Sequence, residues 1–182
     1  MSECPYKNYK SKVIEYINTL RKPRQEFGNM PACPFVGAEL DKGKLMIEIF
    51  DPTISTIIEM VERLENSKYD SGLFVQVTKE DLSEFDTVEY ENFININLKH
   101  NNYEHLKCIC FNPNDTIHVN GFNSRANAPY FLINIAKKKV LGAAHKKLLS
   151  TKYFYNMDKE YLDYLYIEEE HLRRKNEKSN DN

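Results

Sequence analysis

Four short apolar runs, separated by segments with helical spacing, limit most strongly what this chain can fold into. The runs are LMIEIF (45–50), LFVQV (73–77), LKCICF (106–111) and YFLINI (130–135). Apolar runs of this length, bounded by turn residues, indicate buried strands. Because helices alternate with these runs, and helical crossovers join parallel strands, we predict an α/β fold. We expect an open, mostly parallel sheet of about four strands with helices on its faces.

The segments between the runs carry apolar residues at helical spacing. They predict helices over residues 6–21, 34–40, 53–66, 79–98, 137–149 and 158–174. Thr78 is a suitable N-cap for the fourth helix, and residues 117–119 could add one short strand. We expect residues 1–175 to form a single domain and 176–182 to be a disordered tail.

Composition and charge exclude several classes of protein. The chain has 182 residues and a formal net charge of −2, which gives no general attraction to nucleic acid or anionic lipid. No run approaches the length needed to span a membrane, and the polar beginning, MSECPYKNYKSK, does not resemble a secretory signal. We therefore expect a cytoplasmic protein whose four cysteines are reduced thiols.

Cys33 is the first candidate functional residue. Pro34 favours the first position of a helix, which places Cys33 at the N-cap. Unpaired N–H groups and the helix dipole favour thiolate at such a position, so we predict a lowered pKa and a reactive thiol. The alternative is a small buried residue that fixes the junction between loop and helix. Cys108 and Cys110, two apart on one predicted strand, are expected to be core residues.

The second candidate is the long polar segment between the third and fourth runs. Long loops of this kind are uncommon unless they have a function. Its Arg125 could grip a carboxylate or phosphate, and its Asp115 could act as an acid–base group. Asn112, Asn114 and His118 are the further substrate-binding candidates. The alternative is that the Asn and Asp residues only build turns.

No metal or cofactor is indicated by spacing. The five histidines lack an HExxH pattern, paired Cys-x-x-Cys motifs are missing, and no Gly-rich phosphate loop occurs. We predict no metal site, and the cofactor stays undefined.

Two functions remain open. The first is a small-molecule enzyme in which Cys33 is the nucleophile or redox thiol, Asp115 the acid–base group and Arg125 the anion grip. The second is a non-catalytic binding or protein-interaction module that uses the polar loop or the helix over 158–174, the latter also as a homodimer contact. Either way we expect a small-molecule or protein partner, and neither nucleic acid nor a membrane.

The order of the segments resembles an uncharacterised bacterial Cys-Pro-Phe family, domain of unknown function 1415. The matching residues are 33–35 (Cys-Pro-Phe), 111–115 (Phe-Asn-Pro-Asn-Asp), 125–129 (Arg-Ala-Asn-Ala-Pro) and 153–156 (Tyr-Phe-Tyr-Asn). The family turn usually reads Phe-His-Pro, and Asn112 stands at the His position. The resemblance implies no reaction, and the Asn weakens any metal or acid–base role for that turn.

Cys-Pro-Phe also resembles the motif of some thioredoxin-like proteins, such as omega-class glutathione transferases. In that fold the cysteine follows a core strand, and a cis-proline precedes a later strand. Pro129 stands before the YFLINI run, but the segment before Cys33 is polar. A thioredoxin-like fold is therefore a minor alternative.

Overall fold

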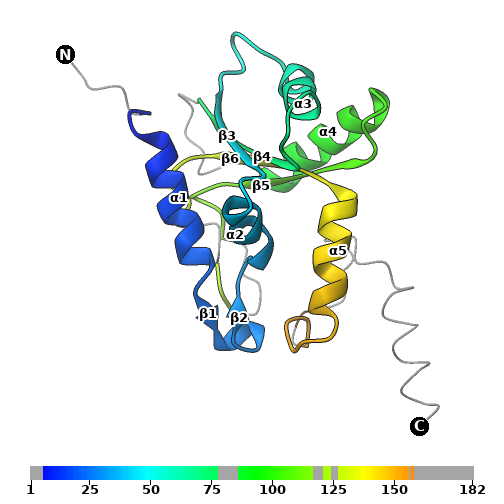
Figure 1. Ribbon diagram of the computed structural model, residues 1–182. Helices are drawn as coiled ribbons and strands as arrows, with labels where there is room; N and C mark the ends of the chain where they lie inside the picture. Colours follow the sequence, from blue (N-terminus) through cyan, green and yellow to red (C-terminus); the bar gives the residue numbers. More distant parts are fainter. Residues whose placement is uncertain (1–5, 78–85, 117–120, 124–126, 156, 158–182) are drawn as a thin grey trace.

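A computed structural model of the protein describes residues 6–77, 86–116, 121–123, 127–155 and 157 (Figure 1). No helix within these ranges is long and apolar enough to cross a membrane. The predicted strand at 117–119, helix at 158–174, tail at 176–182 and cap at Thr78 lie outside them. In chain order the elements are α1 (Tyr9–Leu20), β1 (Pro23–Arg24), η1 (Gln25–Phe27), β2 (Met30–Pro31), α2 (Pro34–Asp41), β3 (Leu45–Phe50), α3 (Ile57–Glu65), β4 (Ser71–Gln76), α4 (Thr87–His100), β5 (Leu106–Phe111), β6 (Leu132–Lys137) and α5 (Lys138–Leu148).

The α/β class and the four-stranded sheet are confirmed, but the expected mostly parallel order is wrong. The strand order is β3-β4-β6-β5, and a separate two-stranded sheet joins β1 to β2. Only β3 and β4 pair in parallel, whereas β6 runs antiparallel to both of its neighbours. The sheet is mixed because the connection between β5 and β6 reverses the chain and inserts β6 between β4 and β5; its described residues, 112–116, 121–123 and 127–131, include no helix.

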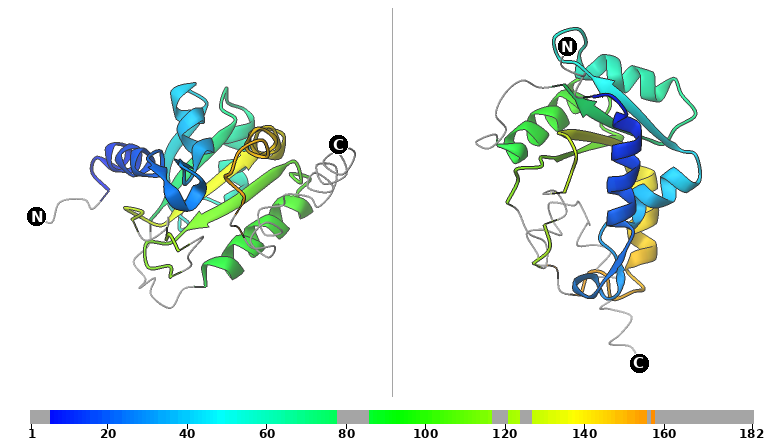
Figure 2. Two further views of the ribbon diagram at one scale, coloured as in Figure 1. Left: turned by 90° about the horizontal axis from the view of Figure 1, so that it is seen from below. Right: turned by 90° about the vertical axis from the view of Figure 1, so that its left-hand side faces the viewer.

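Each face of the sheet carries its own apolar core. On one face α3 and α4 cover residues such as Phe74, Cys108 and Ile133. On the other face α1 and α2 cover residues such as Ile47, Val75 and Leu132. Figure 2 shows these two helical layers on opposite sides of the strands. Cys108 and Cys110 are fully buried with their sulfurs 3.8 Å apart, which confirms them as core residues.

Helix α4 begins at Thr87, and residues 79–85 of the predicted helix over 79–98 lie outside the described residues. Asp86 is its N-cap, because the Asp86 carboxylate accepts a hydrogen bond of 2.8 Å from the N–H of Glu89. Strands β3 and β5 have the predicted limits, while β6 begins two residues after the predicted start.

Helix α4 also closes the outer edge of β5. The Asn95 side chain accepts from the N–H of Cys108 at 2.9 Å and donates to its carbonyl at 3.1 Å. One turn earlier, the fully buried Glu91 accepts from the N–H of Cys110 at 2.9 Å. The edge strand is therefore paired with side chains instead of with another strand.

A third, smaller apolar cluster joins segments that are far apart in sequence. Phe27, Leu148, Tyr153 and Met157 are buried together. The Tyr153 hydroxyl donates to the carbonyl of Ala32 at 2.5 Å, which ties the segment after α5 to the residue before Cys33. This contact fixes the start of α2 relative to the end of α5.

We predict that Asn95→Ala lowers the free energy of unfolding by about 2 kcal/mol, because two backbone groups of β5 lose their partner. Asn97→Ala is the matched control, since the Asn97 side chain donates only to Phe93 within the same helix. It should change stability by less than about 0.5 kcal/mol. Urea unfolding of the two variants checks this, and equal losses would contradict the role of Asn95 at the edge.

Candidate functional site

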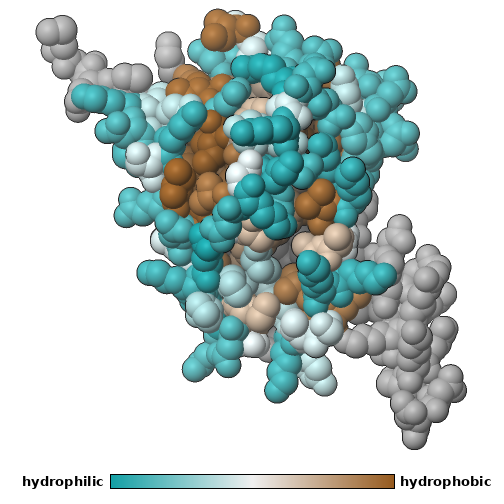
Figure 3. All heavy atoms as spheres, in the orientation of Figure 1, coloured by the Kyte–Doolittle hydropathy of each residue, from teal (hydrophilic) through white to brown (hydrophobic). Residues whose placement is uncertain are grey.

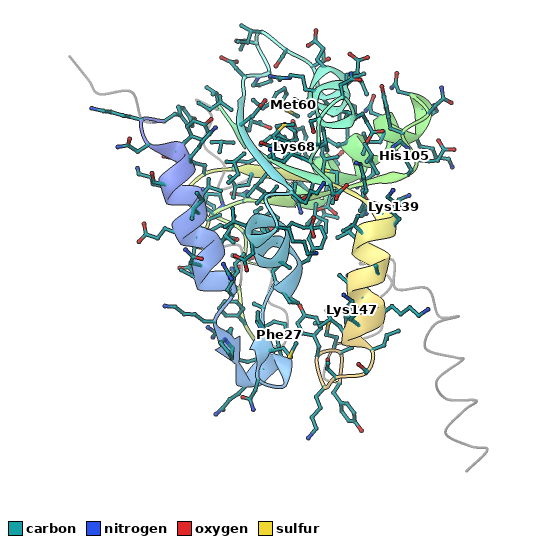
Figure 4. The ribbon with its side chains drawn as sticks, in the orientation of Figure 1. Phe27, Met60, Lys68, His105, Lys139 and Lys147 are labelled. Carbon is teal, nitrogen blue, oxygen red and sulfur yellow. The ribbon has the colours of Figure 1, made fainter. Side chains whose placement is uncertain are left out.

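A pocket of about 220 Å³ lies between α2 and α5. Its walls come from Pro34, Phe35, Ala38, Glu39 and Lys42 of α2 and from Val140, Ala143, Ala144, Lys147 and Leu148 of α5. Figure 1 shows the two helices side by side below the sheet, and Figure 4 labels Lys147 on α5. A concave, mostly apolar site with a few polar groups is the usual form of a small-molecule site.

Small side chains leave this space open. Ala143 and Ala144 on α5 stand opposite Ala38 on α2, at positions where longer side chains would fill the gap. Leu148 lines the pocket and is also part of the buried cluster with Phe27 and Tyr153. The distance between the helices is therefore held by contacts beyond the pocket itself.

One buried acid gives the pocket its polar character. Glu39 is only 2% exposed, and its Oε1 lies 2.9 Å from Nζ of Lys42, whose side chain is exposed. Lys147 is exposed at the opposite wall. Two ammonium groups against one carboxylate leave one positive charge at the mouth of an apolar cavity.

A bidentate ion pair fixes α2 from its other side. The two guanidinium nitrogens of Arg21 lie 3.0 and 2.6 Å from the Asp41 carboxylate. The Arg21 side chain crosses Gly37 so closely that a Cβ there would lie 2.7 Å from Arg21 Cγ. The glycine lets α1 and α2 approach, and the ion pair then fixes their relative position.

Two buried polar atoms lie on the sheet face that α1 and α2 cover. Ser71 Oγ and Asn134 Oδ1 have no hydrogen-bond partner within the part of the chain that the structure describes. Leu73 faces Asn134 across the β4–β6 pair, and Ser71 and Leu73 point to the same face. Buried groups without a partner often mark a bound water or ligand.

Cys33 is the N-cap of α2, as expected, but the expected lowering of its pKa is wrong. The residue is partly buried and packs against the core that α1 and α2 share with the sheet. Burial raises the pKa of the Cys33 thiol, although the N–H groups of Val36 and Phe35 act in the opposite direction. Burial is the larger effect, so these N–H groups at the helix terminus offset the loss of water only in part.

The described part of the polar loop is folded on itself. Asn112 is 2% exposed, and its side chain accepts from the N–H of Asn114 at 2.9 Å. The N–H of Asp115 donates to the Asn112 carbonyl at 3.0 Å, and the Asn123 side chain donates to the Asp115 carbonyl at 2.5 Å. The two bonds within residues 112–115 are turn contacts of the kind that the alternative interpretation expected, and the Asn123 bond joins two parts of the loop.

Some described residues of the polar loop pack against the same core as Cys33 or against the hairpin that precedes it. Phe122 packs edge-on against Phe27 at 6.1 Å, and the Arg24 guanidinium lies 3.6 Å from the Phe122 ring centre. Ala128 and Tyr130, at the end of the loop, belong to the same apolar core as Cys33. Two predicted site residues, His118 and Arg125, lie outside the described residues.

None of the other predicted site residues, Cys33, Asn112, Asn114 and Asp115, lines the α2–α5 pocket. The residues that line this pocket were not identified from the sequence, because alanine side chains carry no chemical group that indicates a site. One signal was present: Glu39 is the only acid within the apolar run PFVGAEL, and an acid in such a run needs a partner when buried.

Across the described ranges, no three His, Cys, Asp or Glu side chains come together as a metal site. No family model, curated protein or solved structure matches the chain. The resemblance to the Cys-Pro-Phe family therefore stays a prediction. Cys33 follows the small β1–β2 hairpin rather than a strand of the main sheet, which gives the thioredoxin-like alternative no support.

We predict that Cys33 titrates above the free-thiol value of about 8.5. The difference in thiolate absorbance between the wild type and Cys33→Ser isolates this group from the other cysteines. The difference should be small at neutral pH and appear only in alkaline solution, because burial penalises the charged form. An apparent pKa below the free-thiol value would contradict this prediction and support the hypothesis that Cys33 is an activated thiol.

Proposed function

We propose that this protein binds a small molecule with an apolar body and one negative charge in the α2–α5 pocket. The combination of an apolar cavity with two lysines at its mouth supports this most directly. The free thiols of Cys33, Cys108 and Cys110 suit a reducing compartment, so we place this function in the cytoplasm.

The charge of the ligand follows from the partners that the pocket already has. Glu39 is paired with Lys42, so a cationic ligand would have to compete with a neighbouring ammonium group. An anionic group can approach Lys42 and Lys147 together while its apolar body enters between the alanines. Aromatic and branched aliphatic carboxylates are therefore the class to test, and their methyl esters are the uncharged comparison.

The lysine at the mouth of the pocket gives the first test. We expect Lys147→Met to weaken carboxylate binding by roughly fivefold, the effect of about 1 kcal/mol for an exposed ion pair. Lys146→Met is the matched control, because Lys146 is an exposed neighbour on α5 that does not line the pocket. Calorimetric titration measures both, and equal losses or equally tight binding of the methyl ester would reject the proposed charge.

The size of the cavity gives a second test. We expect Ala144→Leu to abolish binding, since the added side chain fills space that the ligand needs. The half-exposed position of Ala144 should keep the fold stable, and thermal unfolding checks that. Undiminished binding by a folded Ala144→Leu protein would place the ligand elsewhere.

A second candidate is the thiol enzyme. The N–H groups of Phe35 and Val36 favour the thiolate of Cys33, and Pro34 next to it lines the pocket. In this proposal the Cys33 thiolate attacks the carbonyl carbon of a bound ester, and the C–O bond to the alcohol breaks as the C–S bond forms. Asp115 is the acid that protonates the departing alcohol, water hydrolyses the thioester to release the carboxylate and the thiol, and Arg125 is the anion grip. Cys33→Ser should then remove turnover and leave ligand affinity unchanged. The binding proposal expects no turnover by the wild type and an unchanged affinity in the variant.

A further inference from the structure

The two edges of the main sheet differ. The outer edge of β5 is closed by Asn95 and Glu91, but β3 at the opposite edge has no neighbouring strand among the residues that the structure describes. The carbonyls of Lys44 and Phe50 accept from the N–H groups of Ser71 on β4 and of Val77, which directly follows β4, at 3.3 and 2.7 Å.

Because parallel strands alternate the direction of their backbone groups, the even positions of β3 face β4 and the odd positions face outward. The outward groups belong to Leu45, Ile47 and Ile49. Within the described ranges, no backbone or side chain hydrogen-bonds to them on that side. They form a row of donors and acceptors of the kind that an added strand would pair with.

An open groove of about 830 Å³ runs along this edge between β3 and α3. Met46, Ile49, Ile54 and Tyr69 supply its apolar surface. Ile54 is 82% exposed, and Figure 3 shows apolar atoms at the tip of the loop between β3 and α3. An exposed side chain of this kind beside an unpaired edge favours a contact with another chain.

The charges of the side chains that line the groove favour a positively charged ligand. Four acids line it: Glu48, Asp51, Glu59 and Glu62. Among the described lining residues the one lysine or arginine is Arg63, which lies 3.3 Å from Glu48. Glu59 and Glu62 project from α3 on the side of the groove. Pairing between two copies of β3 would bring a second set of these acids against the first, which repels.

We propose that the β3 edge and its groove bind an extended peptide segment that carries Lys or Arg at alternate positions, by addition of a fifth strand. The backbone of Ile47 and Ile49 pairs with the peptide backbone. Alternate peptide side chains point to the α3 side and reach Glu59 and Glu62, since side chains of a strand alternate between faces. This site is separate from the α2–α5 pocket, so either proposal can fail alone.

The test uses the full chain and an acetylated, amidated Lys-Val-Lys-Val-Lys-Val peptide. We expect saturable binding by NMR titration, with hydrogen exchange at the amides of Ile47 and Ile49 slowed by about tenfold or more. The combined Glu59→Gln and Glu62→Gln variant should bind roughly fivefold more weakly. Gln at position 59 can still complete the capping box with Thr56, so α3 should remain folded.

Matched controls separate strand addition from general attraction between charges. Glu15→Gln removes an exposed acid from α1, away from the groove, and should leave affinity unchanged. A peptide N-methylated at alternate residues and a Glu-Val repeat should both fail to bind. Equal binding of either peptide, protection at other amides, or no binding of the Lys-Val peptide would overturn the proposal. Protection of Ile47 and Ile49 without peptide, in a protein that sediments as a dimer, would assign the edge to a second copy instead.

Discussion

The insertion of β6 between β4 and β5 is the constraint on which the rest of the structure depends. Five consecutive residues of β6, from Leu132 to Ala136, are buried, and the strand supplies both apolar cores in alternation. Its end is fixed by the Lys137 ammonium, which lies 3.1 Å from both the Tyr69 carbonyl and the Asp70 carboxylate. Strand β5 pairs with β6 and not with β4, so β6 is the strand that joins β5 to the parallel pair of β3 and β4. Helix α5 follows β6 directly, so the same strand also sets where one wall of the pocket stands.

The pocket and the thiol show how packing decides chemistry at the start of α2. The helix is held on one side by Arg21 and on the other by the contact of Tyr153 with Ala32. This position buries Cys33, and burial raises the pKa of its thiol. The same position leaves a gap lined by alanines on the α5 side. One packing arrangement therefore both leaves the pocket open and disfavours the thiolate that a reactive cysteine needs.

Patterns within single segments predicted the elements well. The runs at 45–50 and 106–111 became β3 and β5 with the expected limits, because a strand is bounded by local turn residues. The direction of β6 could not be predicted in this way, since a run buried on both faces looks the same in either direction. The site was harder still. Ala143 and Ala144 become significant only when α2 stands opposite them. The Asn112 side chain and the Asp115 N–H take part in turn contacts, which an Asn- and Asp-rich segment predicts as readily as a binding site.

The closure of β5 by α4 has a consequence for assembly. A sheet can grow without limit from molecule to molecule, by pairing of edge strands, only if every molecule has two open edges. Here Asn95 and Glu91 occupy the second edge with side chains of the same chain. One strand can be added beside β3, and the row then ends at a closed edge on the far side. A protein built in this way can accept a partner through its backbone without forming fibres by that route.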